Sequence, residues 1–167
     1  MRRISISGAV ILIAAVASVG TVCAATRKAP AKAHEDKPVM INSADLKWMA
    51  APPIFPPGAQ MAVLQGDPSG ATYTVRLKAG DGYRIPAHWH PQTENVTVIS
   101  GTFHVGLGDK LDESKGTTIT PGGFASMPAR VHHYAWFTGE TEVQVHGIGP
   151  FQLTYVNPAD TPAAARK

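Results

Sequence analysis

The sequence predicts an all-β fold, an antiparallel sandwich or small barrel. Apolar and polar residues alternate in several segments, and half-buried strands show this period of two. Turn-forming residues separate these segments at about the 8 to 12 residue spacing that is typical of such folds. The 167 residues include 16 glycines and 14 prolines, and only 16% are charged, which favours short strands joined by turns over long helices. This length suits a single domain.

The alternating segments place their apolar residues on one face of each expected strand. In residues 72–78, Tyr73, Val75 and Leu77 share a face. In residues 94–100, Val96 and Val98 share a face with Glu94. Further apolar positions of this kind are Phe103, Val105, Val143, Val145, Leu153, Tyr155 and Val156. One short helix is expected within residues 42–49.

The first 24 residues have the pattern of an export signal. Arg2 and Arg3 precede an apolar stretch, and small residues near Ala24 suit a signal peptidase. An uncleaved membrane anchor is the alternative, because residues 4–25 carry no charge and are long enough to span a bilayer. Cleavage after Ala24 predicts a periplasmic or secreted protein with no membrane contact afterwards. The single cysteine, Cys23, then leaves with the signal, so the mature chain has no disulfide.

The remaining chain is expected to contain a flexible linker at 25–42, the β domain at 43–157 and a disordered tail at 158–167. Alanine, lysine and proline dominate the linker, which has no apolar period. The formal charge falls from +3 to +1 when the signal and its two arginines are removed. The mature chain has no basic stripe, and this excludes nucleic acid as an expected partner.

Two histidines separated by one residue are the strongest chemical signal. His88 and His90 project to the same face of an extended strand, and Glu94 has the same parity. Two imidazoles and a carboxylate give nitrogen and oxygen donors that suit Fe(II), Mn(II), Zn(II), Ni(II) or Cu(II). Taken alone, a His-x-His pair is better explained as two surface histidines near a turn.

The surroundings of the pair change this interpretation. Gly82 is followed after five residues by His88, then by His90, Glu94 and, six residues further, Gly101. This pattern resembles the first sequence motif of the cupin superfamily at every defining position.

A segment that is similar to the second cupin motif follows. Gly122 is separated by five residues from Pro128, and His133 lies five positions after that proline. The segment departs from the family pattern where Arg130 replaces the usual glycine and Phe137 replaces a frequent asparagine. A glycine at position 130 would allow a positive φ that arginine adopts only with strain.

The resemblance covers roughly residues 58–155 and is strongest to small exported bacterial cupins of unassigned function. It implies an antiparallel double-stranded β-helix, or jelly-roll barrel, with one divalent metal ion inside. It also implies ligands at His88, His90 and Glu94 from one strand pair and at His133 from a facing strand. A homodimer formed through sheet edges is a further expectation from the family.

The other histidines are weaker candidates. His132 competes with His133, but adjacent strand residues point to opposite faces, and the motif spacing favours His133. His104 is expected at a strand surface, and His34 in the linker. His146 could line a pocket or point outward. The candidates for an apolar rim around the mouth of the site are Tyr83, Trp89, Met127, Tyr134 and Trp136, although barrel packing better explains Met127 and Trp136.

Three or four protein ligands leave positions open on a metal that prefers five or six. The first hypothesis is therefore a metal-dependent, dioxygenase-like enzyme that acts on a small molecule. The second is a non-catalytic module that binds the metal or a small ligand. The third is an isomerase or lyase in which the metal polarises a carbonyl. The sequence names neither the metal nor the substrate.

Overall fold

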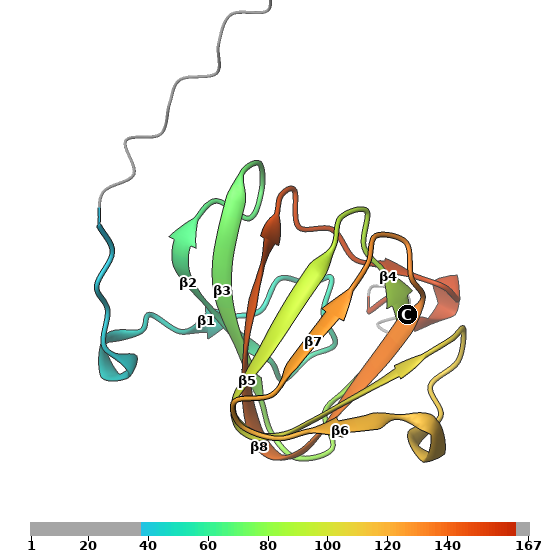
Figure 1. Ribbon diagram of the computed structural model, residues 1–167. Coiled ribbons are helices and arrows are strands. Elements are labelled where there is room, and N and C mark those ends of the chain that lie inside the picture. The colour runs from blue at the N-terminus through green and yellow to red at the C-terminus, as the bar shows by residue number, and fades with distance from the viewer. Residues whose placement is uncertain (1–37, 163–167) are drawn as a thin grey trace, which may run out of the picture. The chain divides into compact units, whose positions relative to one another are not determined.

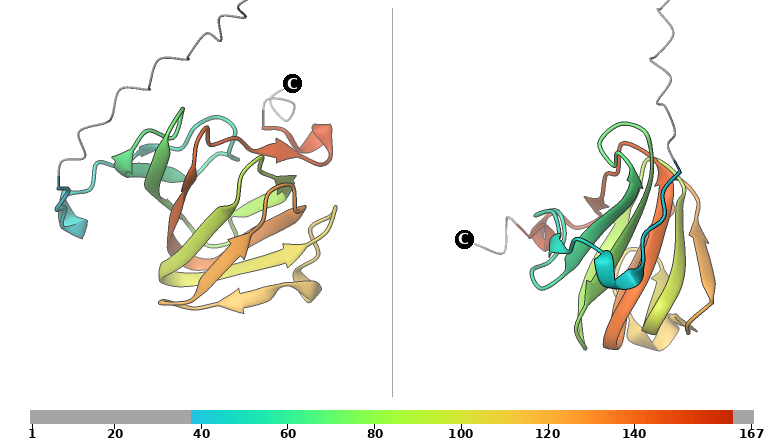
Figure 2. Two further views of the ribbon diagram at one scale, coloured as in Figure 1. Left: turned by 45° about the horizontal axis from the view of Figure 1, so that its top comes forward. Right: turned by 90° about the vertical axis from the view of Figure 1, so that its left-hand side faces the viewer.

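The computed structural model describes residues 38–162, which lie within one compact unit. Nine antiparallel strands form a single sheet that curls round on itself, as Figures 1 and 2 show. The predicted antiparallel jelly-roll barrel is confirmed. The strands are β1 (Met49–Ala50), β2 (Gln60–Gly66), β3 (Thr72–Ala79), β4 (Arg84–Trp89), β5 (Glu94–Leu107), β6 (Thr117–Ile119), β7 (Phe124–Met127), β8 (His133–Ile148) and β9 (Thr154–Tyr155).

Two long strands organise the sheet. The main strand order is β1-β2-β3-β8-β4-β9, so β8 pairs with β3 along one half and with β4 along the other. β5 runs antiparallel to β8 and also pairs with β7 near its start and with β6 near its end. Because β5 and β8 each pair with different strands along their two halves, both must bend for the sheet to close into a barrel.

The bend lies where the β5–β8 register shifts, between Val98 and Thr102. Gly101 has a φ of +75°, and a Cβ there would come within 2.3 Å of the Glu140 carbonyl oxygen. The neighbouring Thr141 is fully buried; its Oγ1 accepts a hydrogen bond from the Thr102 backbone N–H at 3.0 Å. The last glycine of the first motif is therefore the corner of the barrel, where only a residue without a side chain fits.

The barrel interior is apolar, as the period-two pattern predicts. Tyr73, Val75 and Leu77 are all buried, and so are Val96 and Val98. The interior cluster also includes Phe55, Phe103, Val105, Phe137, Val143 and Val145. β3 and the first part of β5 therefore place alternate residues inside, which leaves the residues between them on the outer face.

A second buried cluster lies apart from the interior one. It contains Ala87, Tyr134 and Trp136, and the Tyr134 hydroxyl donates a hydrogen bond to the Asp112 carbonyl oxygen at 3.0 Å. Gly116 lies so close to the Trp136 ring that a Cβ would clash with it. Tyr134 and Trp136 are therefore packed under the loop that carries the 3₁₀ helix η2 (Glu113–Lys115) and do not form a rim around the site.

The ends of the domain differ in detail from the sequence expectation. Within residues 42–49 the helix is a single 3₁₀ turn, η1 (Ser43–Asp45), and the chain enters β1 at Met49. The disordered tail was predicted to begin at residue 158, but Pro158–Asp160 form the 3₁₀ helix η3, capped by the Asn157 side chain. The cap and the proline start this turn locally, which sequence reasoning overlooked.

The export signal at 1–24, most of the linker at 25–42 and residues 163–167 lie outside the described residues. Within residues 38–162, no helix has the length and apolar character that crossing a membrane requires.

Candidate metal centre

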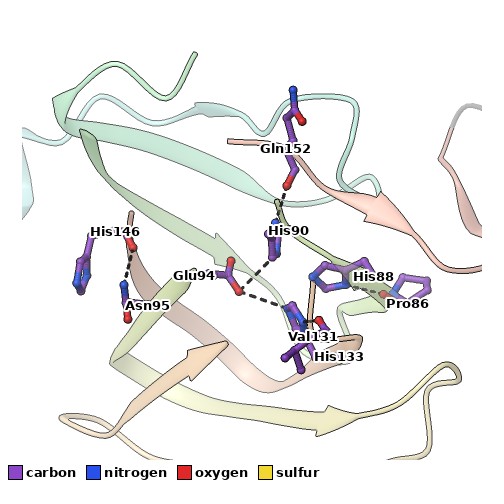
Figure 3. A network of polar contacts seen from close by, with 9 residues as sticks. All are labelled: Pro86, His88, His90, Glu94, Asn95, Val131, His133, His146 and Gln152. Atoms are coloured by element: carbon purple, nitrogen blue, oxygen red, sulfur yellow. Dashed lines mark hydrogen bonds and ion pairs between the residues drawn. The ribbon is translucent and has the colours of Figure 1, made fainter. Parts of the chain in front are cut away.

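Four side chains from three strands meet at one end of the barrel interior. His88 lies in β4, and His90 is the first residue after the end of β4. Glu94 is the first residue of β5, and His133 is the first residue of β8. His88 and His133 are cross-strand partners in the β4–β8 pairing. His133 therefore comes from the strand next to His88, which corrects the expectation of a facing strand. Figure 3 shows the four side chains turned toward one another.

The three imidazoles are close enough to share one ion. His88, His90 and His133 each offer a ring nitrogen, and these atoms lie within 4.8 Å of one another. One Glu94 carboxylate oxygen, Oε2, lies 3.5 Å from His90 Nε2 and 3.4 Å from His133 Nε2. All three histidines are buried, at 6% exposure or less. The structure thus brings together all four residues that the sequence predicted.

Backbone carbonyl groups fix the orientation of each imidazole. The Nδ1 atoms of His88, His90 and His133 lie 2.7, 2.6 and 3.0 Å from the carbonyl oxygens of Pro86, Gln152 and Val131. A carbonyl oxygen only accepts, so each Nδ1 carries the hydrogen and donates it. Each Nε2 then presents a lone pair, which is the form that binds a metal. Sequence reasoning missed these carbonyls because main-chain partners leave no residue-type signal.

The donor set fits a metal ion. His90 Nε2 and His133 Nε2 are buried and have no hydrogen-bond partner. Buried polar atoms are seldom left unpaired, because losing water without a replacement costs about 1 to 3 kcal/mol each. Lone pairs and a carboxylate oxygen face one another here, and acceptors do not satisfy acceptors. A divalent cation among them would satisfy all of these atoms at once.

Burial also fixes the charge of the site. Burial lowers the pKa of His88 to about 3, and the neighbouring His133 and His90 lower it further. Burial alone would raise the pKa of Glu94, but the imidazoles of His90, His133 and His88 outweigh it and bring that pKa down to about 2. At neutral pH His88 is therefore uncharged and Glu94 is a carboxylate, the ligating form of each.

The pKa of His88 predicts that the metal-free protein loses stability in acid. A histidine in the unfolded chain has a pKa of about 6.5. As the pH falls from about 6.5 toward 3, His88 therefore binds a proton in the unfolded chain but not in the folded one, and this favours unfolding. Glu94 acts in the same direction below its ordinary pKa of 4.5. Thermal unfolding of metal-free protein between pH 7 and 4 should show a steady fall in midpoint. We expect His88→Ala to flatten that slope, and an equal slope in this variant would contradict the prediction.

An apolar cavity of about 30 Å³ adjoins the cluster. His88, Glu94 and His133 contribute its only polar side chains, and Met127 lies in its wall. The other lining residues are aliphatic or aromatic, and include Val75, Leu77, Val96, Phe103, Phe137, Phe55, Phe151 and Leu153. A volume of this size holds a water molecule or a comparably small molecule. Phe55 and Phe151 lie in loops and were not expected at the site from the sequence.

The turn before β8 determines which histidine points inward. Arg130 has a φ of +65°, as expected at the usual glycine position, and its backbone N–H donates to the His90 carbonyl oxygen at 2.8 Å. Its guanidinium lies over the Trp89 ring, 5.7 Å from the centroid. The start of β8 keeps the register that the motif spacing predicts, although Arg130 replaces the usual glycine. His133 is 2% exposed and lies inside the barrel, whereas His132 points outward to Asp109.

The remaining candidates lie away from the cluster. His104 stacks on Trp136 and bonds Thr118 and Thr138, as expected of a strand-surface residue. His146 is exposed, and Figure 3 shows it on the far side of Glu94 from the three imidazoles. Tyr83 is buried and donates to the Pro56 carbonyl oxygen, so it packs in the core and forms no rim. His34 lies outside the described residues.

Comparison with known proteins gives one family and many structural relatives. Residues 36–152 match the family model described as ChrR cupin-like domain. No match was found among curated proteins.

Among solved structures, the polyketide cyclase RemF from Streptomyces resistomycificus is 15% identical, with a TM-score of 0.61 over 74% of this chain and 88% of that one. A putative acetylacetone dioxygenase from Methylibium petroleiphilum is 19% identical, with a TM-score of 0.58 over 80% and 94%. KdgF from Halomonas sp. is 18% identical, with a TM-score of 0.51 over 66% and 94%. At such low identities, these structural matches show a shared fold alone.

Proposed function

Because this chain belongs to the ChrR cupin-like family, we propose that it binds one divalent metal ion through His88, His90, Glu94 and His133 and uses it on a small molecule. The convergence of three imidazole lone pairs is the observation that carries the proposal. Each imidazole is oriented by a backbone carbonyl oxygen that accepts a hydrogen bond from Nδ1–H, so the ligands are in position before the ion binds.

The surroundings of the ligands support an oxidative reaction of the dioxygenase type. Four protein ligands leave one or two positions open on iron, manganese, nickel or copper. Such an ion supplies redox chemistry with dioxygen or polarises a bound oxygen atom. The chain itself contributes a wall of aliphatic and aromatic side chains to the cavity that His88, Glu94 and His133 also line. One structural relative is described as a putative acetylacetone dioxygenase, which agrees with this proposal.

The size of the cavity favours a second candidate, a metal-binding module without turnover. About 30 Å³ suits a water or a diatomic molecule and leaves little room for an organic substrate. In a module of this kind the ion or its small ligand would be the only cargo.

Metal analysis of protein purified from its native host without added metal tests the proposal. We expect about one divalent ion per chain, in accord with the single ligand set. Iron, manganese, copper or nickel, together with oxygen uptake in the presence of candidate small molecules, supports the enzyme. Full occupancy without oxygen uptake supports the module. A protein that contains no stoichiometric metal and takes up none on titration would refute both.

Export completes the proposal. The signal pattern of residues 1–24 supports a periplasmic or secreted protein. N-terminal sequencing of the mature protein should begin at Ala25 or Thr26, and an intact Met1 on membrane-bound protein would contradict export by cleavage.

A further inference from the structure

Most of the wall around the cavity is rigid. All but three of its lining residues lie in strands, and the exceptions are Phe55, Phe151 and Leu153. Phe55 belongs to the loop between β1 and β2, and the other two belong to the connection from β8 to β9 (Figure 1). An opening in the wall that does not break the sheet must therefore involve these loops.

Phe151 is packed among rings on several sides. Its centroid lies 5.8 Å from Phe55 in a stacked arrangement and 5.6 Å from Tyr73 in an edge-on one. It also lies 5.5 Å from the His90 ring. The next residue, Gln152, accepts the His90 Nδ1–H hydrogen bond, and Figure 3 shows it directly beside that ligand. Phe151 therefore occupies the space immediately beside the metal centre.

Phe151 also borders a second, smaller pocket, the outer pocket, most of whose other lining residues are exposed or half-buried. Its volume is about 10 Å³, and its walls include His90, Pro91, Gln92 and Pro150. Only Glu94 and Phe151 line both this pocket and the inner cavity. Glu94 opens β5 and faces the imidazoles, whereas Phe151 lies in a segment without helix or strand and is only half-buried. The Phe151 ring is thus the movable part of the partition.

The backbone of Phe151 is tied as well, because its N–H donates to the Pro68 carbonyl oxygen at 2.6 Å, so any opening must come from its ring. The loop that carries Phe55 is tied at two carbonyl groups. The Tyr83 hydroxyl donates to the Pro56 carbonyl oxygen at 2.8 Å, and the Tyr155 hydroxyl donates to that of Ile54 at 2.8 Å. Phe55 is 6% exposed. Phe55 therefore forms a fixed surface against which the Phe151 ring closes.

On these contacts we propose that Phe151 determines which molecules reach the metal centre, by closing the cavity beside His88 and His133 against all but compact, apolar ones. The inference builds on the proposed function, since it assigns the entry side and the substrate class of that site. The molecule it admits carries one metal-coordinating atom and little else, because the closed cavity offers about 30 Å³ and no polar side chain beyond the ligand cluster.

Chemical modification of metal-free protein tests access directly. Diethyl pyrocarbonate reacts with unprotonated imidazole nitrogen, and mass spectrometry gives the rate at each histidine. In the wild type, His88 and His133, which line the inner cavity, should react slowly relative to His132, whose side chain is 41% exposed. Phe151→Ala should accelerate them at least about tenfold while leaving His132 unchanged, since local opening sets the rate at buried groups.

Phe103→Ala is the matched control. Phe103 is buried and lines the same cavity, but it lies in β5 and has no part in the outer pocket. Loss of its ring loosens the interior without opening the partition, so the rates at His88 and His133 should stay within about threefold of the wild type. Equal acceleration in both variants, or none in Phe151→Ala, would overturn the proposal. If either alanine variant does not fold, Phe151→Leu and Phe103→Leu provide the same comparison.

Cobalt(II)-loaded protein gives a second measurement, by visible absorption. Azide should bind the wild type and Phe151→Ala with affinities within about threefold, whereas 4-phenylimidazole should bind the variant at least about tenfold more tightly, because the added ring needs the vacated space. Similar 4-phenylimidazole affinities would overturn the proposal. Failure of the wild type to take up cobalt would refute the metal site instead, and the modification rates would still decide the role of Phe151.

Discussion

Replacing His88 and His90 together with alanine should abolish metal binding. The change removes two of the three imidazoles whose Nε2 atoms converge, and leaves Glu94 and His133 as a pair of donors. Two donors do not complete the three or four positions that protein metal sites use. Metal analysis after dialysis should fall from about one ion per chain to nearly none, and added metal should no longer raise the thermal midpoint.

His104→Ala is the control for this experiment. His104 also touches aromatic and hydroxyl partners, but it lies on the outer face of the sheet, stacked on Trp136. This variant should keep its metal. Full occupancy in the double variant would disprove the site, and loss of metal in His104→Ala would show that the ion binds elsewhere. If the double variant does not fold, His90→Gln gives the same test with less loss of volume.

The second large effect separates His133 from its neighbour. His133→Ala should weaken metal affinity by at least about tenfold, since even residues that only orient a ligand contribute 10-fold to 100-fold. His132→Ala should change it little, because the His132 ring points outward and its Nδ1 lies 2.6 Å from Asp109 Oδ1. Side-by-side metal titrations measure both. The reverse order would mean that β8 begins one residue out of register in solution, with His132 inside.

The sequence predicted the structure best where the period of two along a strand determines which side chains are buried. Alternation placed Tyr73, Val75 and Leu77 inside because a strand has only two faces, and burial decides between them. Motif spacing placed His133 correctly against His132. The same motif has a glycine at position 130, and Arg130 adopts the positive φ of +65° that a glycine there would allow.

What the sequence did not provide comes from contacts between distant segments. Tyr134 looks like a rim residue in the sequence, yet it packs with Trp136 under the loop containing Gly116, on the outside of the barrel. Phe151 carries no periodic signal, and its place beside His90 depends on how the β8–β9 connection crosses the barrel end. His133 lies on the strand next to His88 because β4 pairs with β8. The sequence of either strand alone does not specify this pairing.

The bend at Gly101 has a kinetic consequence for an ion held in this site. Along the β5–β8 ladder, Glu94 is paired with Gly147 at one end, and His133 is paired with Leu107 at the other. The curl of the sheet brings these remote ends together, so that the two side chains are 3.4 Å apart. An ion bound by both Glu94 and His133 would join the two ends of the ladder, and it would leave only after these ends separate. A chelator should therefore remove the metal at a rate that reaches a plateau with chelator concentration and equals the rate at which the barrel opens.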